Sequence, residues 1–235
     1  MSPPFDTPYS CAVADRTSTQ SYKTERFKAF VDAVVAIAMT LLILPLTESV
    51  AEAGAEGLST IEFLDEHSGQ LMSFLLSFFL IANFWMGHHR QYDEVIRVTR
   101  PLLLCNVLWM ATIVWLPVPT AMLGQMDTDA LQQTLYIGTL VLTQAVTLVG
   151  RVYVLRHPEL TTASPSRVQH GAAADIATIT LFVIALALSI PLGPRGYLAL
   201  LLLVLTGPLA RLVLRIWPGT HGEGVEPPRG DAADV

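Results

Sequence analysis

The chain has 235 residues, of which 52% are hydrophobic and only 14% are charged, and its formal net charge is −6. Soluble domains carry about 25% charged residues, so this composition argues against a soluble protein and favours one compact helical domain in a membrane. Nothing in the sequence indicates a soluble catalytic domain or a nucleic-acid partner. Cys11 lies in a polar segment and Cys105 in a hydrophobic one, so no disulfide is predicted.

The first element is a polar segment, residues 1–22, rich in Pro, Ser and Thr and predicted to be a disordered tail. The hydrophobic stretch 26–46 follows and contains, after Lys28, one charged residue, Asp32. At 1.5 Å per residue it can cross a hydrocarbon core of roughly 30 Å. A cleaved signal peptide is the alternative, but an apolar run of about 18 residues exceeds the usual 7–15 of a signal core. An uncleaved spanning helix is therefore favoured.

Five more spanning helices are predicted, in chain order, over 69–89, 101–117 (or to 123), 131–155, 172–190 and 197–217. An acidic loop, 47–68, follows the first helix, and Pro117 and Pro119 are expected to bend or end the third. Residues 218–235 are rich in Gly, Pro and acids and are predicted to be a second disordered tail. The predicted fold is all-α: a polytopic membrane protein with six transmembrane helices in one domain, 23–217.

Basic residues predict the orientation in the membrane. All Lys and Arg residues except Arg195 fall on one side of the predicted bundle: before or at the start of the first helix, at the connections after the second and fourth helices, or at the carboxyl-terminal end of the sixth helix and beyond it. The positive-inside rule therefore predicts a multi-pass protein of the cell membrane with both termini in the cytoplasm. The opposite connections carry acidic residues, which either concentrate cations at an outer mouth or simply keep the loops solvated.

A few polar residues near the predicted helix ends could carry function. Asp32 is costly inside a spanning helix and is expected to have a partner, either Lys28 one turn earlier or a group on another helix. His88 and His89 could bind a metal, but no further ligand cluster lies nearby in the sequence. A Ser-His-Asp triad is not supported. Asp175 is placed in the first turn of its predicted helix, where it would suit the helix dipole.

Three motifs identify a family resemblance. The first predicted helix opens with R-x-x-x-F-V-D, at Arg26, Phe30 and Asp32. The second contains W-x-x-H, at Trp85 and His88, and the third contains an early Asn, Asn106. This pattern resembles the endolysosomal potassium channel family (transmembrane protein 175 family), in which the first motif is R-x-x-x-F-S-D. Val31 stands here in place of the serine. Prokaryotic members have six helices per chain and form homotetramers, so the resemblance implies a homotetrameric channel in the lipid bilayer, with a pore built from helix one of several subunits.

The resemblance also implies roles for individual residues. The six motif residues are expected to join the first three helices at the cytoplasmic end. Bulky apolar residues of helix one are expected to form the pore constriction, at Ile37, Leu41 and Leu44, with the Thr40 hydroxyl beside them. By spacing alone, such residues usually pack against other helices or face lipid. The implied function is a potassium-selective or potassium-preferring channel with no cofactor other than the permeant potassium ion, and no enzyme; a T-V-G-Y-G filter is absent from the sequence. The alternative is a secondary transporter or a non-conducting accessory membrane protein.

Overall fold

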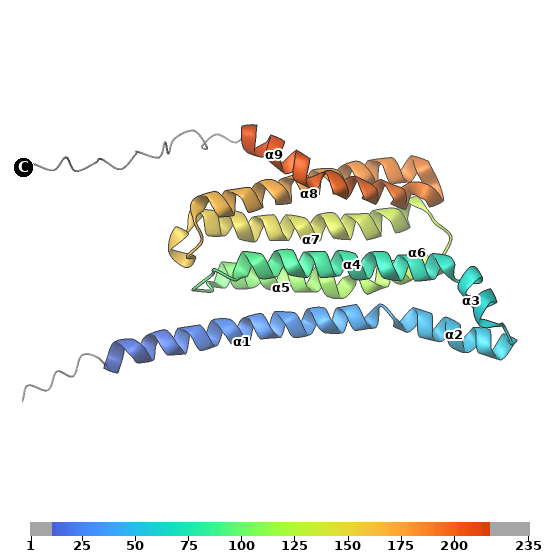
Figure 1. Ribbon diagram of the computed structural model, residues 1–235, viewed down its shortest axis with the longest axis horizontal. Helices are drawn as coiled ribbons and strands as arrows, with labels where there is room; N and C mark the ends of the chain where they lie inside the picture. The colour runs from blue at the N-terminus through green and yellow to red at the C-terminus, as the bar shows by residue number, and fades with distance from the viewer. Residues whose placement is uncertain (1–10, 217–235) are drawn as a thin grey trace, which may run out of the picture.

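The regular elements of the computed structural model, which describes residues 11–216, are all helical (Figure 1). They are α1 (Cys11–Leu41), α2 (Leu44–Glu56), α3 (Thr60–Glu66), α4 (Ser68–Tyr92), α5 (Arg100–Trp115), α6 (Pro117–Gln125), α7 (Ala130–Arg156), the short 3-10 helix η1 (Pro158–Leu160), α8 (Pro165–Leu192), the 3-10 helix η2 (Gly193–Leu205) and α9 (Thr206–Ile216). Six helical stretches are long and apolar enough to cross a membrane. The predicted all-α fold with six spanning helices is confirmed.

Proline divides two of the six spans. The first span breaks between α1 and α2 because Pro45 has no N–H to donate to the carbonyl of Leu41 and its ring crowds that turn. The third span breaks between α5 and α6, where Pro117 opens the new helix, as the sequence predicts. The first span was expected to be a single helix over 26–46; the break places Leu44 on a different helical segment from Ile37 and Leu41.

Several helices begin or end beyond their predicted bounds. α1 already includes residues 11–22, which the sequence predicts to be irregular, since extending an existing helix avoids the cost of nucleation. Residues 1–10 and the predicted tail 218–235 lie outside the described residues. α8 begins at Pro165 rather than at 172, because the Ser164 side chain caps it by accepting a hydrogen bond from the Arg167 N–H and Pro165 fits the first turn.

The predicted acidic loop, 47–68, is also mostly helical. α2 continues to Glu56 and ends at Gly57, whose positive φ of 75° suits glycine. α3 begins with a capping box, in which the Ser59 side chain and the Glu62 carboxylate each bind the other's backbone N–H. Figure 1 shows α2 and α3 extending past the rest of the bundle at one end.

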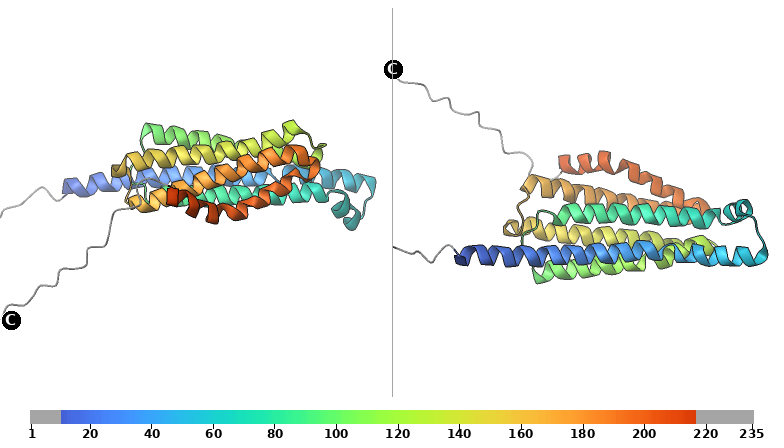
Figure 2. Two further views of the ribbon diagram at one scale, coloured as in Figure 1. Left: turned by 90° about the horizontal axis from the view of Figure 1, so that it is seen from above. Right: turned by 60° about the horizontal axis from the view of Figure 1, so that its bottom comes forward.

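The long helices lie side by side and nearly parallel or antiparallel to one another (Figures 1 and 2). α1 packs on α4 and α5, α7 packs on α5 and α8, and η2 and α9 fold back along α8. The main apolar core joins α1 to the rest through buried residues such as Val31, Ala38, Phe84 and Trp109. α1 is thus held on one side only.

The two ends of the bundle differ in charge. We call the end formed by the start of α8, the ends of α4 and α7 and the links between them the basic end; it carries Arg90, Arg97, Arg100, Arg151, Arg156 and Arg167. The opposite end, formed by α2 and α3, is the acidic end, with Glu48, Glu52, Glu56, Glu62, Asp65 and Glu66.

Candidate pore helix and basic-end network

The membrane-spanning part of α1 is apolar on two opposite faces. One face is buried against α4 and α5, with Val31, Val35 and Ala38 at most 2% exposed. The other face carries Phe30, at 58% exposed, and Ile37, at 59%. Because Val35 and Ile37 point to different sides, a substitution at each probes a different environment.

The residues predicted to form a constriction all lie outside the bundle of the single chain. Leu41 is 37% exposed and Leu44, beyond the break, is 50% exposed. Packing within the protomer, one of the two ordinary explanations for such residues, therefore covers only part of each side chain. The exposed part of these side chains therefore faces either lipid or another subunit.

Thr40 shares this exposed side, but its hydroxyl is engaged locally. The Thr40 Oγ1 donates to the carbonyl of Ile37 at 2.7 Å. The side chain thus presents only oxygen lone pairs to its surroundings.

At the basic end, Asp32 reaches α4. The Trp85 Nε1–H donates to the Asp32 Oδ1 at 2.8 Å, and this tethers α1 to α4. Lys28, the local partner considered for Asp32, instead binds Asp93, donating to its carbonyl at 3.1 Å with its carboxylate 3.8 Å away. Arg26, also predicted in this network, has an exposed side chain one turn before Phe30.

His88 forms a second, separate contact between α4 and α5. Its Nε2 lies 2.7 Å from the Asn106 Oδ1, and the Asn106 Nδ2 donates to the Leu102 carbonyl at 2.7 Å. The imidazole is also stacked between Trp109 and Tyr92, with ring centroids 4.1 Å and 4.5 Å away. The fixed orientation of this buried ring suits a structural link between helices.

The two contacts are neighbours. Asp32 and His88 line one small cavity of about 10 Å³, but no hydrogen bond joins them in the described part of the chain. Four of the predicted motif residues are thus joined as the bonded pairs Asp32–Trp85 and His88–Asn106. Val31, which replaces the motif serine, is 2% exposed and belongs to the apolar core, so the missing hydroxyl is replaced by packing.

The described side chains contain no group of three or more His, Cys, Asp or Glu residues that could hold a metal ion. His88 is engaged with Asn106, and the ring of His89 lies against that of Trp85, with centroids 5.8 Å apart.

A buried ion pair that the sequence did not indicate lies between α7 and α8. The Arg151 Nε donates to the Asp175 Oδ2 at 2.5 Å, and the Gln144 Nε2 donates to the Asp175 Oδ1 at 2.8 Å. Asp175 was expected in a first helical turn, stabilised by the helix dipole; because α8 begins at Pro165, Asp175 lies well inside the helix and the expectation was wrong. The signal that could have located the helix start is Ser164-Pro165, a cap followed by a first-turn proline.

These features define a multi-pass helical membrane protein whose first span is attached to the bundle on one face only. Residues 26–117 match the family described as "Endosomal/lysosomal potassium channel TMEM175". This confirms the resemblance predicted from the sequence: the chain is similar to prokaryotic members of the TMEM175 family, a family of ion channels and not of enzymes.

Two individual relatives are named as potassium channels, in agreement with the match to this family. A potassium channel of Streptomyces collinus is 37% identical over 100 residues, 43% of this chain and 47% of the relative. A potassium channel of Chamaesiphon minutus is 32% identical over 103 residues, 44% of this chain and 50% of the relative. The chain thus spans about half the length of the curated relatives it matches.

The fold has a counterpart among solved structures. The crystal structure of a lysosomal potassium-selective channel TMEM175 homologue from Chamaesiphon minutus superimposes with a TM-score of 0.59 and 22% sequence identity. The superposition covers 83% of this chain and 96% of the other. At this identity the match supports the fold.

Proposed function

We propose that the protein is a potassium-preferring cation channel whose pore is lined by α1 of several identical subunits. The observation that carries the proposal is the exposed apolar face of α1, centred on Ile37 and Leu41, on a helix held at its other face by the bundle. We take potassium as the permeant ion because both prokaryotic relatives are named as potassium channels.

A single copy of this face cannot enclose a path for ions. Closed cyclic symmetry would bring copies of α1 together around one axis, and we propose a homotetramer by analogy with the prokaryotic family members. The anchors at Asp32–Trp85 and His88–Asn106 would then fix the depth and rotation of each pore helix. Phe30 would lie at the entrance on the same exposed face.

An apolar ring can gate and select without binding ions. When narrow, it excludes water and blocks conduction. When wider, it passes a partly dehydrated ion, and dehydration costs more for sodium than for potassium. Between Asp32 and Glu48 the chain has no ionisable residue, so no fixed charge of α1 competes with this mechanism.

We further propose that the basic end faces the cytoplasm of a cell membrane, with both termini on that side, and that residues 23–217 form the channel domain between two tails. The support is the gathering of Lys and Arg at one end of the bundle and of acids at the other. The acidic end would then raise the local cation concentration outside.

A secondary transporter is the second candidate, favoured by the break between α1 and α2, since discontinuous helices often line transporter sites. Potassium flux from liposomes with no other ion gradient and no energy source separates the two. A channel dissipates the potassium gradient in either direction; flux that requires a sodium or proton gradient would establish the transporter. Crosslinking in mild detergent tests assembly: tetramers support the proposal, and monomers alone count against it.

A further inference from the structure

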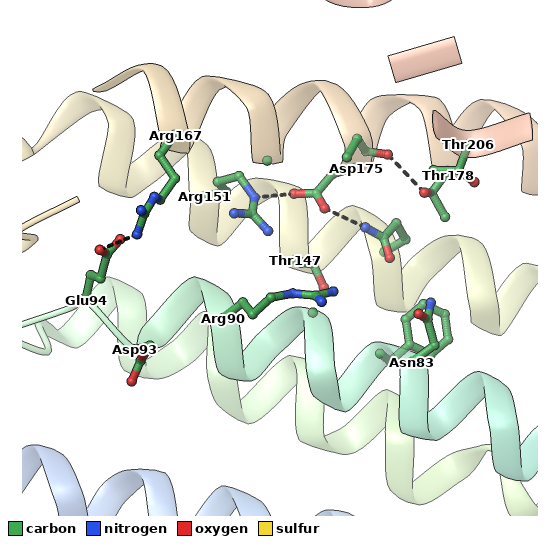
Figure 3. Close-up of a pocket in the computed structure, with 15 residues that line it drawn as sticks. Asn83, Arg90, Asp93, Glu94, Thr147, Arg151, Arg167, Asp175, Thr178 and Thr206 are labelled. Carbon is green, nitrogen blue, oxygen red and sulfur yellow. Dashed lines mark hydrogen bonds and ion pairs between the residues drawn. The ribbon is translucent and has the colours of Figure 1, made fainter. Parts of the chain in front are cut away.

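A cavity of about 520 Å³ opens at the basic end between α4 and the α7–α8 pair (Figure 3). Three arginines line it, one from each of these helices: Arg90, Arg151 and Arg167. In Figure 3 the side chains of Arg90 and Arg151 reach into the space between the helices. This cavity is separate from the exposed face of α1 proposed as the pore.

Most guanidinium donors in this cavity have no acceptor among the residues that the structure describes. A guanidinium carries five N–H groups. Arg151 uses its Nε on Asp175, and Arg167 uses its Nη1 on Glu94 at 2.5 Å. Arg90 forms no hydrogen bond or ion pair with any of the residues whose side chains the structure describes, 25–193 and 196–216.

The carboxylates of the same cavity are, by contrast, already engaged. Both oxygens of Asp175 accept hydrogen bonds, and Glu94 is paired with Arg167. Asp93 points away from the cavity in Figure 3, toward Lys28 on α1. The Asp175 oxygens are thus occupied, while the Arg90 guanidinium and the remaining N–H groups of Arg151 and Arg167 are left as donors for an anion with several oxygens.

The position of the cavity suits a phosphate group. Arginine forks match the oxygens of phosphate, and basic pockets between membrane helices bind lipid head groups. Glu94 and Arg167 lie at the helix ends, whereas Asn83 and Thr178 line the cavity roughly 16 Å deeper, at 1.5 Å per helical residue. The arginines thus stand near the level of the phosphates in the adjacent leaflet, with neutral polar groups below them.

We propose that Arg90, Arg151 and Arg167 form a binding site for a phosphate-bearing anion, either a phospholipid head group or free phosphate. Arg90 is the principal anchor because its guanidinium is bonded to none of the described side chains. Arg151, held in place by Asp175, and Arg167 supply further N–H donors from the opposite wall. The proposal does not depend on conduction.

The test is a thermal-stability titration of the purified full-length protein in detergent at constant ionic strength. The probes are dioctanoyl phosphatidylglycerol, zwitterionic dioctanoyl phosphatidylcholine and inorganic phosphate. We expect phosphatidylglycerol or phosphate to raise the melting temperature saturably. Arg90→Ala should weaken the apparent affinity about tenfold, the loss expected for one charge-assisted contact. Arg97→Ala is the matched control, since Arg97 is exposed at the same end but does not line the cavity.

The three probes distinguish the sources of the anion. A response to phosphatidylglycerol alone identifies a lipid site, and an equal response to inorganic phosphate identifies a site for the free ion. Arg167→Ala provides a second variant with the same expected direction. The proposal is overturned if neither anion stabilises the protein more than phosphatidylcholine does, or if Arg90→Ala and Arg97→Ala bind alike.

Discussion

Removing the carboxylate of Asp175 should destabilise the bundle strongly. The Asp175 and Arg151 side chains are 8% and 14% exposed, so Asp175→Ala leaves a largely buried guanidinium without its partner. Breaking a buried pair costs about 3–5 kcal/mol, and the lower end applies because Arg151 also lines the 520 Å³ cavity, which admits water. The Gln144 amide loses its acceptor as well, at about 1 kcal/mol. A total of about 3–4 kcal/mol corresponds to a melting temperature lower by roughly 6–16 °C.

Tryptophan fluorescence during thermal unfolding in detergent measures this loss. Asp127→Ala, at an exposed acid of the opposite end, should change stability by less than about 0.5 kcal/mol. The double variant Asp175→Leu/Arg151→Met should recover much of the stability, because an apolar pair of similar volume often replaces a buried ion pair without loss. If Asp175→Ala melts at the same temperature as Asp127→Ala, the pair is solvated and the reasoning fails.

Three further predictions follow from the two ends of the bundle. A cysteine at Glu56 should react with an impermeant thiol reagent added outside intact cells, and one at Arg167 should not; the reverse would invert the proposed orientation. Asp32→Ala removes the acceptor of the Trp85 indole and should cost about 1.5–3 kcal/mol of stability or impair assembly; wild-type expression and melting would show that the contact is dispensable. Hydrogen bonds from the capping serine lower the pKa of Glu62, so the cap of α3 is fully formed above the ordinary value of 4.5 and weakens as pH falls through the lowered pKa. Faster hydrogen exchange in α3 at acid pH would confirm this, and exchange unchanged after correction for the intrinsic rate would refute it.

The sequence predicted the number, type and order of the spans because each is a long apolar run between charged segments. The family resemblance implied a network of the motif residues, within which the structure joins His88 to Asn106 on helices adjacent in the chain. The sequence did not predict that Arg151 and Asp175 face each other, because this contact depends on how α7 is rotated against α8. The environment of Ile37 could not be predicted either, because its side chain is 59% exposed in the single chain and the sequence of one chain does not say what covers it.

The most direct test of the proposed pore is a recording of potassium and sodium currents from reconstituted protein carrying Ile37→Asn. Val35→Asn would place an amide in the core, at a side chain 2% exposed, so the better control is Leu104→Asn on α5, where the side chain is 63% exposed against 59% for Ile37. An amide at the constriction admits water, so Ile37→Asn should raise basal cation current and reduce the preference for potassium, while Leu104→Asn leaves both unchanged. If Ile37→Asn conducts and selects like the wild-type protein, or if Leu104→Asn alters both properties equally, the exposed face of α1 does not line the pore.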